Sequence, residues 1–175
     1  MKLKAGDPFP AKTFRAVSGK ELCVPDSRLL THLQFRRFVG CPICNTHIGE
    51  MMKRAEEIKS AGIREVIFFH STQKEMQPLQ QGVPFHLVAD PEKVYYKEFG
   101  VEACLASILN RQAIAASIRG VLRGSLPMKM TGGPLGLPAD FLIEPNGQVR
   151  AAKYGRHAYD QWSVDELLGL AKGGS

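Results

Sequence analysis

The chain has 175 residues, a formal net charge of +6, and 44% hydrophobic against 23% charged residues. This composition is typical of a globular protein with one core, and four cysteines are too few for a disulfide scaffold in a chain of this size. No stretch approaches the roughly 20 apolar residues that span a bilayer, and the basic residues are scattered, so neither a membrane nor a nucleic-acid partner is expected. Residues 1–7 lack the apolar core of a secretory signal, so a reducing, cytoplasmic setting is the expectation.

The N-terminal third of the chain predicts a hairpin, a strand and a long helix. Two short extended pieces, residues 13–17 and 21–24, flank a Ser-Gly-Lys turn, which is typical of a β-hairpin. Residues 33–39 form the first strong strand pattern. Apolar residues three or four positions apart then predict a helix to about Ser60, where Gly62 ends it.

The next part of the chain alternates strands with helices. Continuous apolar runs at residues 65–69 and 85–89 predict strands that are covered on both faces. Each run is followed by a helix with a capping residue at its start, and these helices are expected over residues 72–82 and 90–100. Strands that alternate with helices indicate parallel strand pairs.

The C-terminal part predicts a second hairpin and a short helix. Residues 141–143 and 148–153 flank a Pro-Asn-Gly sequence, which is the strongest hairpin signal in the chain. Ser163 and Glu166 have the spacing of a capping box, so a terminal helix is expected to begin there. The predicted fold is therefore α/β, with a central mixed sheet, helices on both of its faces and an N-terminal hairpin, in a single domain over residues 1–175.

An insertion at about residues 101–137 interrupts this order. Residues 105–123 are expected to be helical, whereas the Gly- and Pro-rich remainder is expected to be irregular. We interpret the insertion as an added surface helix packed on the sheet. A lid or a partner-binding element near the cysteines is the alternative.

The most informative motif is Cys41-Pro-Ile-Cys44, at the point where the strand turns into the long helix. A thiol at a helix N-terminus is ionised more easily, because unpaired N–H groups and the helix dipole stabilise the thiolate. Cys44 follows one helical turn later, points the same way and can close a disulfide. Pro42 suits the first helical position because it lacks an N–H. Cys41 is therefore the predicted nucleophile, and Cys44 the less exposed resolving thiol.

These features resemble the thioredoxin superfamily, because the strand–CxxC–helix unit is followed by Pro138 and the second hairpin. Within that superfamily, the residue 6–10 lead-in and the Phe-Val-Gly-Cys-Pro-Ile-Cys pattern resemble the peroxiredoxin-like proteins of the AhpC/TSA group. The resemblance implies a thioredoxin-like fold and a thiol-dependent oxidoreductase that reduces peroxides or disulfides. It also implies a cis bond before Pro138, which would lie against the CxxC.

The same resemblance implies what the protein would work with. Peroxides or disulfides would be the substrates, and an external thiol reductant, of the thioredoxin type or glutathione, would restore the oxidised Cys41–Cys44 pair. No bound cofactor is expected. The sequence leaves a homodimer open.

The chain departs from typical peroxiredoxins at three positions. Those proteins carry a proline and a threonine or serine seven and three positions before the reactive cysteine, where this chain has Gln34 and Phe38. They also carry an arginine near the later hairpin strand, where this chain has Pro-Ala. Arg36 or Arg37 is the candidate replacement, and since neighbouring strand residues face opposite ways, Arg37 is taken as the supporting residue.

Two alternatives follow from these departures. The chain could be a binding module that kept the fold and lost the chemistry. It could also hold a metal through Cys41, Cys44 and His47, although a fourth ligand at suitable spacing is missing. We favour neither, and interpret His47 as a surface helix residue.

The remaining cysteines and histidines carry no predicted role. We expect Cys23 and Cys104 to behave as small buried apolar residues. The other four histidines have no partner at a useful spacing: His32, His70, His86 and His157.

Overall fold

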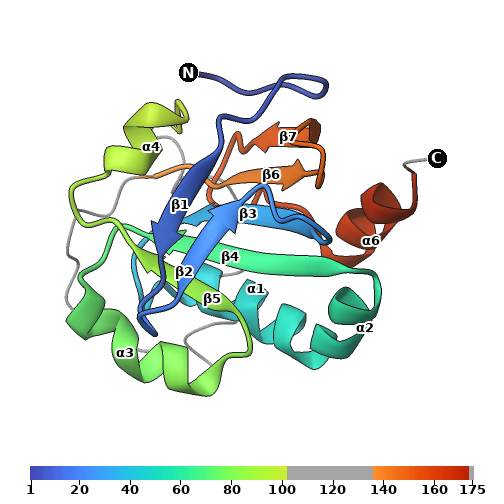
Figure 1. The fold of residues 1–175 in the computed structure, drawn as a ribbon. Coiled ribbons are helices and arrows are strands. Elements are labelled where there is room, and N and C mark those ends of the chain that lie inside the picture. The colour runs from blue at the N-terminus through green and yellow to red at the C-terminus, as the bar shows by residue number, and fades with distance from the viewer. Residues whose placement is uncertain (102–135, 174–175) are drawn as a thin grey trace.

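The computed structural model describes residues 1–101 and 136–173. Its strands are β1 Lys12–Arg15, β2 Glu21–Val24, β3 Leu30–Arg36, β4 Ile63–Phe69, β5 His86–Ala89, β6 Ala139–Ile143 and β7 Val149–Tyr154 (Figure 1). Its helices are α1 Pro42–Lys53, α2 Ala55–Ser60, α3 Gln73–Gly82, α4 Val94–Glu98 and α6 Val164–Lys172. Within these residues, no helix is long and apolar enough to cross a membrane.

The central sheet has five strands in the order β5-β4-β3-β6-β7. The middle strand, β3, runs parallel to β4 and antiparallel to β6. Strands β1 and β2 form a separate antiparallel hairpin. The predicted mixed sheet and N-terminal hairpin are therefore confirmed.

Two hydrophobic cores cover the two faces of this sheet. One core contains apolar side chains of α1, α2, α3 and α6, and the other contains those of the hairpin and α4. Figure 1 shows α1 and α4 on opposite sides of the sheet. The predicted helices on both faces are thus confirmed, and β3 is buried along its whole length.

Three differences from the predicted element boundaries concern the candidate site or the long helices. Strand β3 ends at Arg36 instead of residue 39, because the next residues bond to the end of β4. The long helix breaks at Arg54, whose backbone has φ −115° and ψ 19°. Helix α4 begins only at Val94, but the Asp90 carboxylate still accepts the Val94 amide at 2.8 Å. The predicted helix over residues 105–123 and Cys104 lie outside the described residues.

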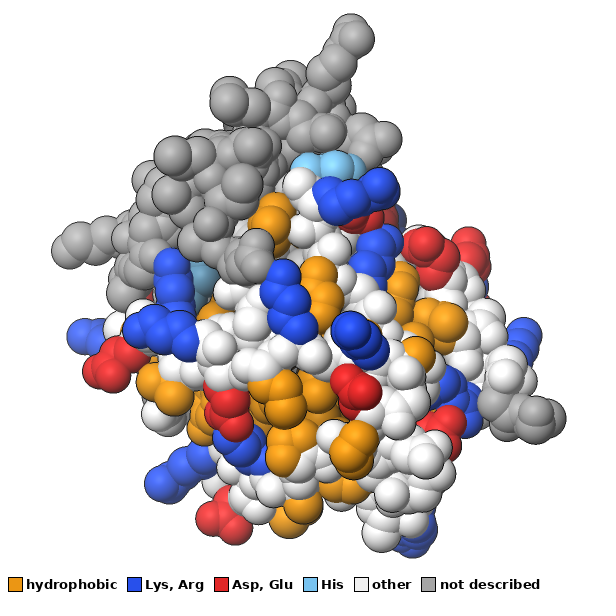
Figure 2. Space-filling model, turned by 90° about the horizontal axis from the view of Figure 1, so that it is seen from above, with side chains coloured by type: hydrophobic (Ala, Val, Ile, Leu, Met, Phe, Trp, Pro, Cys, Tyr) orange, Lys and Arg blue, Asp and Glu red, His pale blue; other side chains and the backbone are white. Residues whose placement is uncertain are grey.

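The surface agrees with the scattered basic residues of the sequence. On the face in Figure 2, Lys and Arg side chains are interspersed with acidic and hydrophobic ones.

Candidate active site

The turn from β3 into α1 places Cys41 at the helix start. Gly40 has a φ of +82°, a value that favours glycine, and it reverses the chain direction. Cys41 is the N-cap residue, and its carbonyl accepts the Asn45 amide at 2.9 Å. Pro42 is the first residue of α1, so the predicted order of thiol, proline and helix is confirmed.

The two thiols are reduced and lie in contact. Both are free cysteines, and Cys44 is hydrogen-bonded to Cys41. This hydrogen bond, burial and the charge of Cys41 raise the pKa of Cys44 well above its usual range. The raised pKa keeps Cys44 protonated, so its S–H can donate a hydrogen bond to the sulfur of Cys41.

The expected difference in exposure between the two thiols is not observed. Cys41 exposes 1% of its surface and Cys44 exposes 2%. Both sulfur atoms lie in the core between α1 and the sheet. Exposure to solvent therefore does not distinguish the two thiols.

Arg37 lies beside the second thiol. The backbone amide of Arg37 hydrogen-bonds Cys44, and this bond and the Arg37 charge oppose the upward shift of the Cys44 pKa. The end of β4 holds the segment in place: the His70 amide donates to the Arg37 carbonyl at 3.1 Å, and the Val39 amide donates to Ser71 Oγ at 3.0 Å.

Pro138 is buried just before β6, but the Leu137–Pro138 bond is trans, so the predicted cis bond is wrong. Among the described residues, the peptide bond between Val24 and Pro25 is cis. The Gly155 amide holds the Pro138 carbonyl at 2.8 Å. A Cβ atom at Gly155 would lie 2.6 Å from Pro138 Cγ, so the backbone just after β7 packs closely against this proline.

A buried group of polar side chains lies between α1 and the sheet, and we call it the polar cluster. Its members come from β3, β4, β6 and α1: His32, Gln34, Arg36, Glu65, Asp140 and His47. Arg36 donates to Asp140 Oδ1 at 2.5 Å and to Gln34 Oε1 at 2.7 Å. His32 lies 2.8 Å from Glu65 Oε2 and 3.1 Å from Asp140 Oδ1.

The charges inside the polar cluster set its protonation states. Burial alone would lower the pKa of His32, but Glu65 and Asp140 outweigh it and raise that pKa to about 9. Burial would raise the pKa of Asp140, but Arg36 and His32 hold it well below its usual range. Burial and the Arg36 charge lower the pKa of His47 to about 3. At neutral pH, His32 is therefore cationic, Asp140 is anionic and His47 is neutral.

Two predictions for single residues are wrong. His47 exposes 3% of its surface, because Nε2 lies 3.5 Å from Arg36 inside the polar cluster instead of facing solvent. Cys23 is exposed, because it occupies an outward position of the hairpin strand β2. Among residues 1–101 and 136–173, no three His, Cys, Asp or Glu side chains are grouped to hold a metal.

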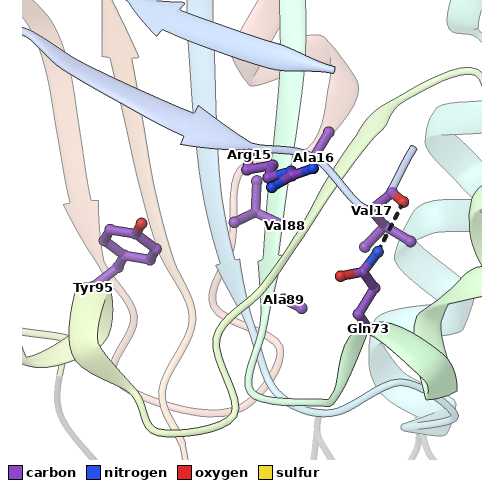
Figure 3. Close-up of a pocket in the computed structure, with 7 residues that line it drawn as sticks. All are labelled: Arg15, Ala16, Val17, Gln73, Val88, Ala89 and Tyr95. Atoms are coloured by element: carbon purple, nitrogen blue, oxygen red, sulfur yellow. Dashed lines mark hydrogen bonds between the residues drawn. The ribbon is translucent and has the colours of Figure 1, made fainter. Parts of the chain in front are cut away.

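A small cavity lies elsewhere, where the hairpin meets β5 and α4. It has a volume of about 200 Å³, and Arg15, Gln73 and Tyr95 are among the residues that line it (Figure 3). At one end of the cavity, Gln73 donates to the Val17 carbonyl at 3.5 Å. Neither cysteine lines this cavity.

Comparisons with solved structures identify the fold as thioredoxin-like. Peroxidoxin BcpB from Mycobacterium tuberculosis superposes with a TM-score of 0.67 over 99% of both chains at 14% identity. A putative thiol:disulfide interchange protein DsbE from Chlorobium tepidum superposes with a TM-score of 0.61 at 20% identity, over 97% of this chain and 99% of that one.

A family comparison is more specific. Residues 50–157 match the family described as AhpC/TSA antioxidant enzyme. Since this match spans more than half of the chain, the protein belongs to the AhpC/TSA antioxidant enzyme family. The match begins after Cys41 and Cys44, so the assignment of these residues depends on their geometry. A search of curated proteins gives no significant match.

Proposed function

We propose that the protein is an oxidoreductase that reduces peroxides or disulfides through Cys41 and Cys44. The observation that carries the proposal is the pair of free, hydrogen-bonded thiols at the start of α1, of which Cys44 has a raised pKa. Membership in the AhpC/TSA family supports thiol-dependent redox chemistry in general.

With a peroxide, the Cys41 thiolate attacks the O–O bond. Sulfur takes one oxygen and becomes a sulfenic acid, and the other oxygen leaves as an alcohol or water after taking a proton. Cys44 then attacks the sulfenic sulfur, an S–S bond forms, and water leaves with the proton that Cys44 lost. With a disulfide substrate, Cys41 forms a mixed disulfide, and Cys44 displaces the substrate thiol. In both cycles an external thiol reductant, a small protein or glutathione, reduces the Cys41–Cys44 bond.

The proposal is tested with serine variants of the two thiols. Reduction of hydrogen peroxide, an organic hydroperoxide and a protein disulfide is measured for wild type, Cys41→Ser and Cys44→Ser. Cys41→Ser is expected to abolish activity. Cys44→Ser is expected to stop after one turnover, with a trapped sulfenic acid or mixed disulfide visible by mass spectrometry.

The exposed Cys23 supplies the matched control. Cys23→Ser removes a thiol of the same chain far from the proposed chemistry, and it is expected to retain full activity. A wild-type protein that reduces none of the three substrates would contradict the proposal.

One observation favours a second candidate, a binding module without chemistry. Each thiol exposes 2% of its surface or less, which restricts access to a bulky substrate. Titration of Cys41 separates the two functions: a module is expected to show the pKa of an ordinary thiol, about 8.5, and a catalyst a lower one.

A further inference from the structure

One peptide unit joins a tyrosine hydroxyl to the second thiol. The carbonyl oxygen of Arg36 accepts a hydrogen bond from the hydroxyl of Tyr96. The amide of Arg37, at the other end of the same peptide unit, hydrogen-bonds Cys44. The hydroxyl and the sulfur therefore act on opposite ends of a single planar group.

The surroundings of Tyr96 hold its hydroxyl in this position. Tyr96 exposes 4% of its surface, and its ring packs edge-on against Phe35 at 5.1 Å and His70 at 5.7 Å. Its hydroxyl also lies 2.9 Å from the Phe68 carbonyl, so it reaches the ends of both β3 and β4. The Asp90 carboxylate accepts the Tyr96 amide at 3.4 Å, which fixes the first turn of α4.

The hydroxyl remains a donor over the working range of pH. Burial and the charges of Asp90 and Cys44 raise the pKa of Tyr96 well above its usual range, against the opposing charge of Arg36. The charged or titratable groups that interact with Cys44 are Cys41 at the start of α1, Arg37 just after β3, and Tyr96 of α4, whose pKa the Cys44 charge raises.

We propose that Tyr96 is a positioning residue for Cys44, because its hydroxyl orients and polarises the peptide unit whose amide holds the sulfur. A hydrogen bond to a peptide carbonyl strengthens the N–H at the other end as a donor. A stronger N–H donor favours the thiolate of the sulfur that it contacts. This inference rests on the proposed function, in which Cys44 must lose its proton before it attacks the oxidised Cys41.

The step that Tyr96 assists is the closure of the Cys41–Cys44 bond. The Cys44 proton leaves, its sulfur attacks Cys41, and the leaving group on Cys41 departs with a proton as water or as the substrate thiol. Tyr96 touches neither sulfur in this step. Because its phenol stays neutral over the working range of pH, Tyr96 acts on Cys44 through the Arg36–Arg37 peptide unit.

Tyr96→Phe tests the proposal, because it removes the hydroxyl and keeps the ring packing. In a Cys41→Ser background, where the charge of Cys41 is absent, the Cβ chemical shift of Cys44 is followed by NMR against pH. Tyr96→Phe is expected to raise the pKa of Cys44 by about half a unit, which lowers its thiolate fraction at a given pH about threefold. In the wild-type background, disulfide closure after one peroxide equivalent is expected to slow by a similar factor.

Tyr95→Phe is the matched control. Tyr95 is the preceding residue, but it lines the cavity of Figure 3 and packs against Phe14. Its variant is expected to leave the Cys44 titration unchanged. A folded Tyr96→Phe protein with the same Cys44 pKa as its parent would overturn the proposal.

A second substitution keeps the test valid if Tyr96→Phe does not fold. Replacing Tyr96 by 3-fluorotyrosine retains the hydroxyl and makes it a stronger donor, so the Cys44 pKa is expected to fall, and an unchanged or raised value would overturn the proposal. Titration requires no turnover. A protein without reductase activity would therefore contradict the proposed function while still reporting on Tyr96.

Discussion

At the scale of the residue, Arg36 decides whether the polar cluster holds together. Arg36 lies on the middle strand of the sheet, and its side chain is fully buried. Its guanidinium contacts Asp140 and Gln34. A buried cation is stable only if neighbouring groups replace the interactions that it would make with water. Arg36 is one of the two candidate replacements for the arginine of typical peroxiredoxins, but in the structure its guanidinium forms an ion pair with Asp140.

Arg36→Met is expected to lower the free energy of unfolding by about 3–5 kcal/mol, because the Asp140 carboxylate would stay buried without its main partner. Urea denaturation at pH 7 measures the change. Arg54→Met is the control, since Arg54 forms its ion pairs with Glu57 and Asp165 at the surface. A loss as small as that of the surface variant would show that Asp140 does not depend on Arg36.

At the scale of the element, the start of α1 matters more than its interior. Gly40 reverses the chain with a φ of +82°, and Cys41 follows directly. Gly49 lies in the interior of α1, and an added Cβ there would meet no atom within 4 Å. Replacing each of these two glycines by alanine therefore compares the effect of a Cβ in the turn with its effect in the helix.

Gly40→Ala is expected to destabilise the protein by about 1–2 kcal/mol, because the left-handed conformation is unfavourable for a residue with a Cβ. Gly49→Ala is expected to stabilise it by about 0.5–1 kcal/mol through higher helix propensity. Thermal unfolding of both variants checks the two signs. If Gly40→Ala gained stability, the turn before Cys41 would have a different backbone from the one described.

At the scale of the whole molecule, the polar cluster connects three strands of the sheet to α1. The pKa values of its two histidines shift in opposite directions. Two carboxylates outweigh burial at His32 and raise its pKa, whereas burial and the Arg36 guanidinium lower the pKa of His47. The free energy of unfolding therefore depends on pH both above and below the ordinary pKa of histidine, about 6.5.

The free energy of unfolding is expected to peak near pH 6.5. Since the pKa of His32 is about 9 in the folded chain and about 6.5 when unfolded, its contribution is complete below pH 6.5 and is lost as pH rises toward 9, by about 3 kcal/mol in all. Since the pKa of His47 is about 3 in the folded chain, stability also falls as pH drops below 6.5 and the unfolded chain takes up the proton.

Urea denaturation between pH 4 and pH 8 measures both limbs. His32→Gln is expected to flatten the limb above pH 6.5. His86→Gln, on the edge strand β5, is expected to leave that limb intact. A His32→Gln protein that keeps the alkaline fall would show that another group causes it.

Much of the fold could be predicted from the sequence because its signals are local. Apolar periodicity and capping residues are properties of a few neighbouring positions, and they correctly indicated the sheet strands, both hairpins and the capped α3 and α6. The boundary at Arg54 could not be predicted in this way. It coincides with ion pairs that Arg54 makes with Glu57 and with the distant Asp165.

For the candidate site, the sequence by itself determined that Cys41 and Cys44 meet at a helix start, since strand, turn and helix are adjacent in the chain. The tertiary structure alone decided what surrounds them. His32 and Asp140 are 108 positions apart and meet because β3 pairs with β6, and Tyr96 reaches the strand ends from α4. Strand register and helix packing bring together segments that are distant in the chain. No local sequence pattern could therefore predict the polar cluster, the burial of both thiols or the trans bond before Pro138.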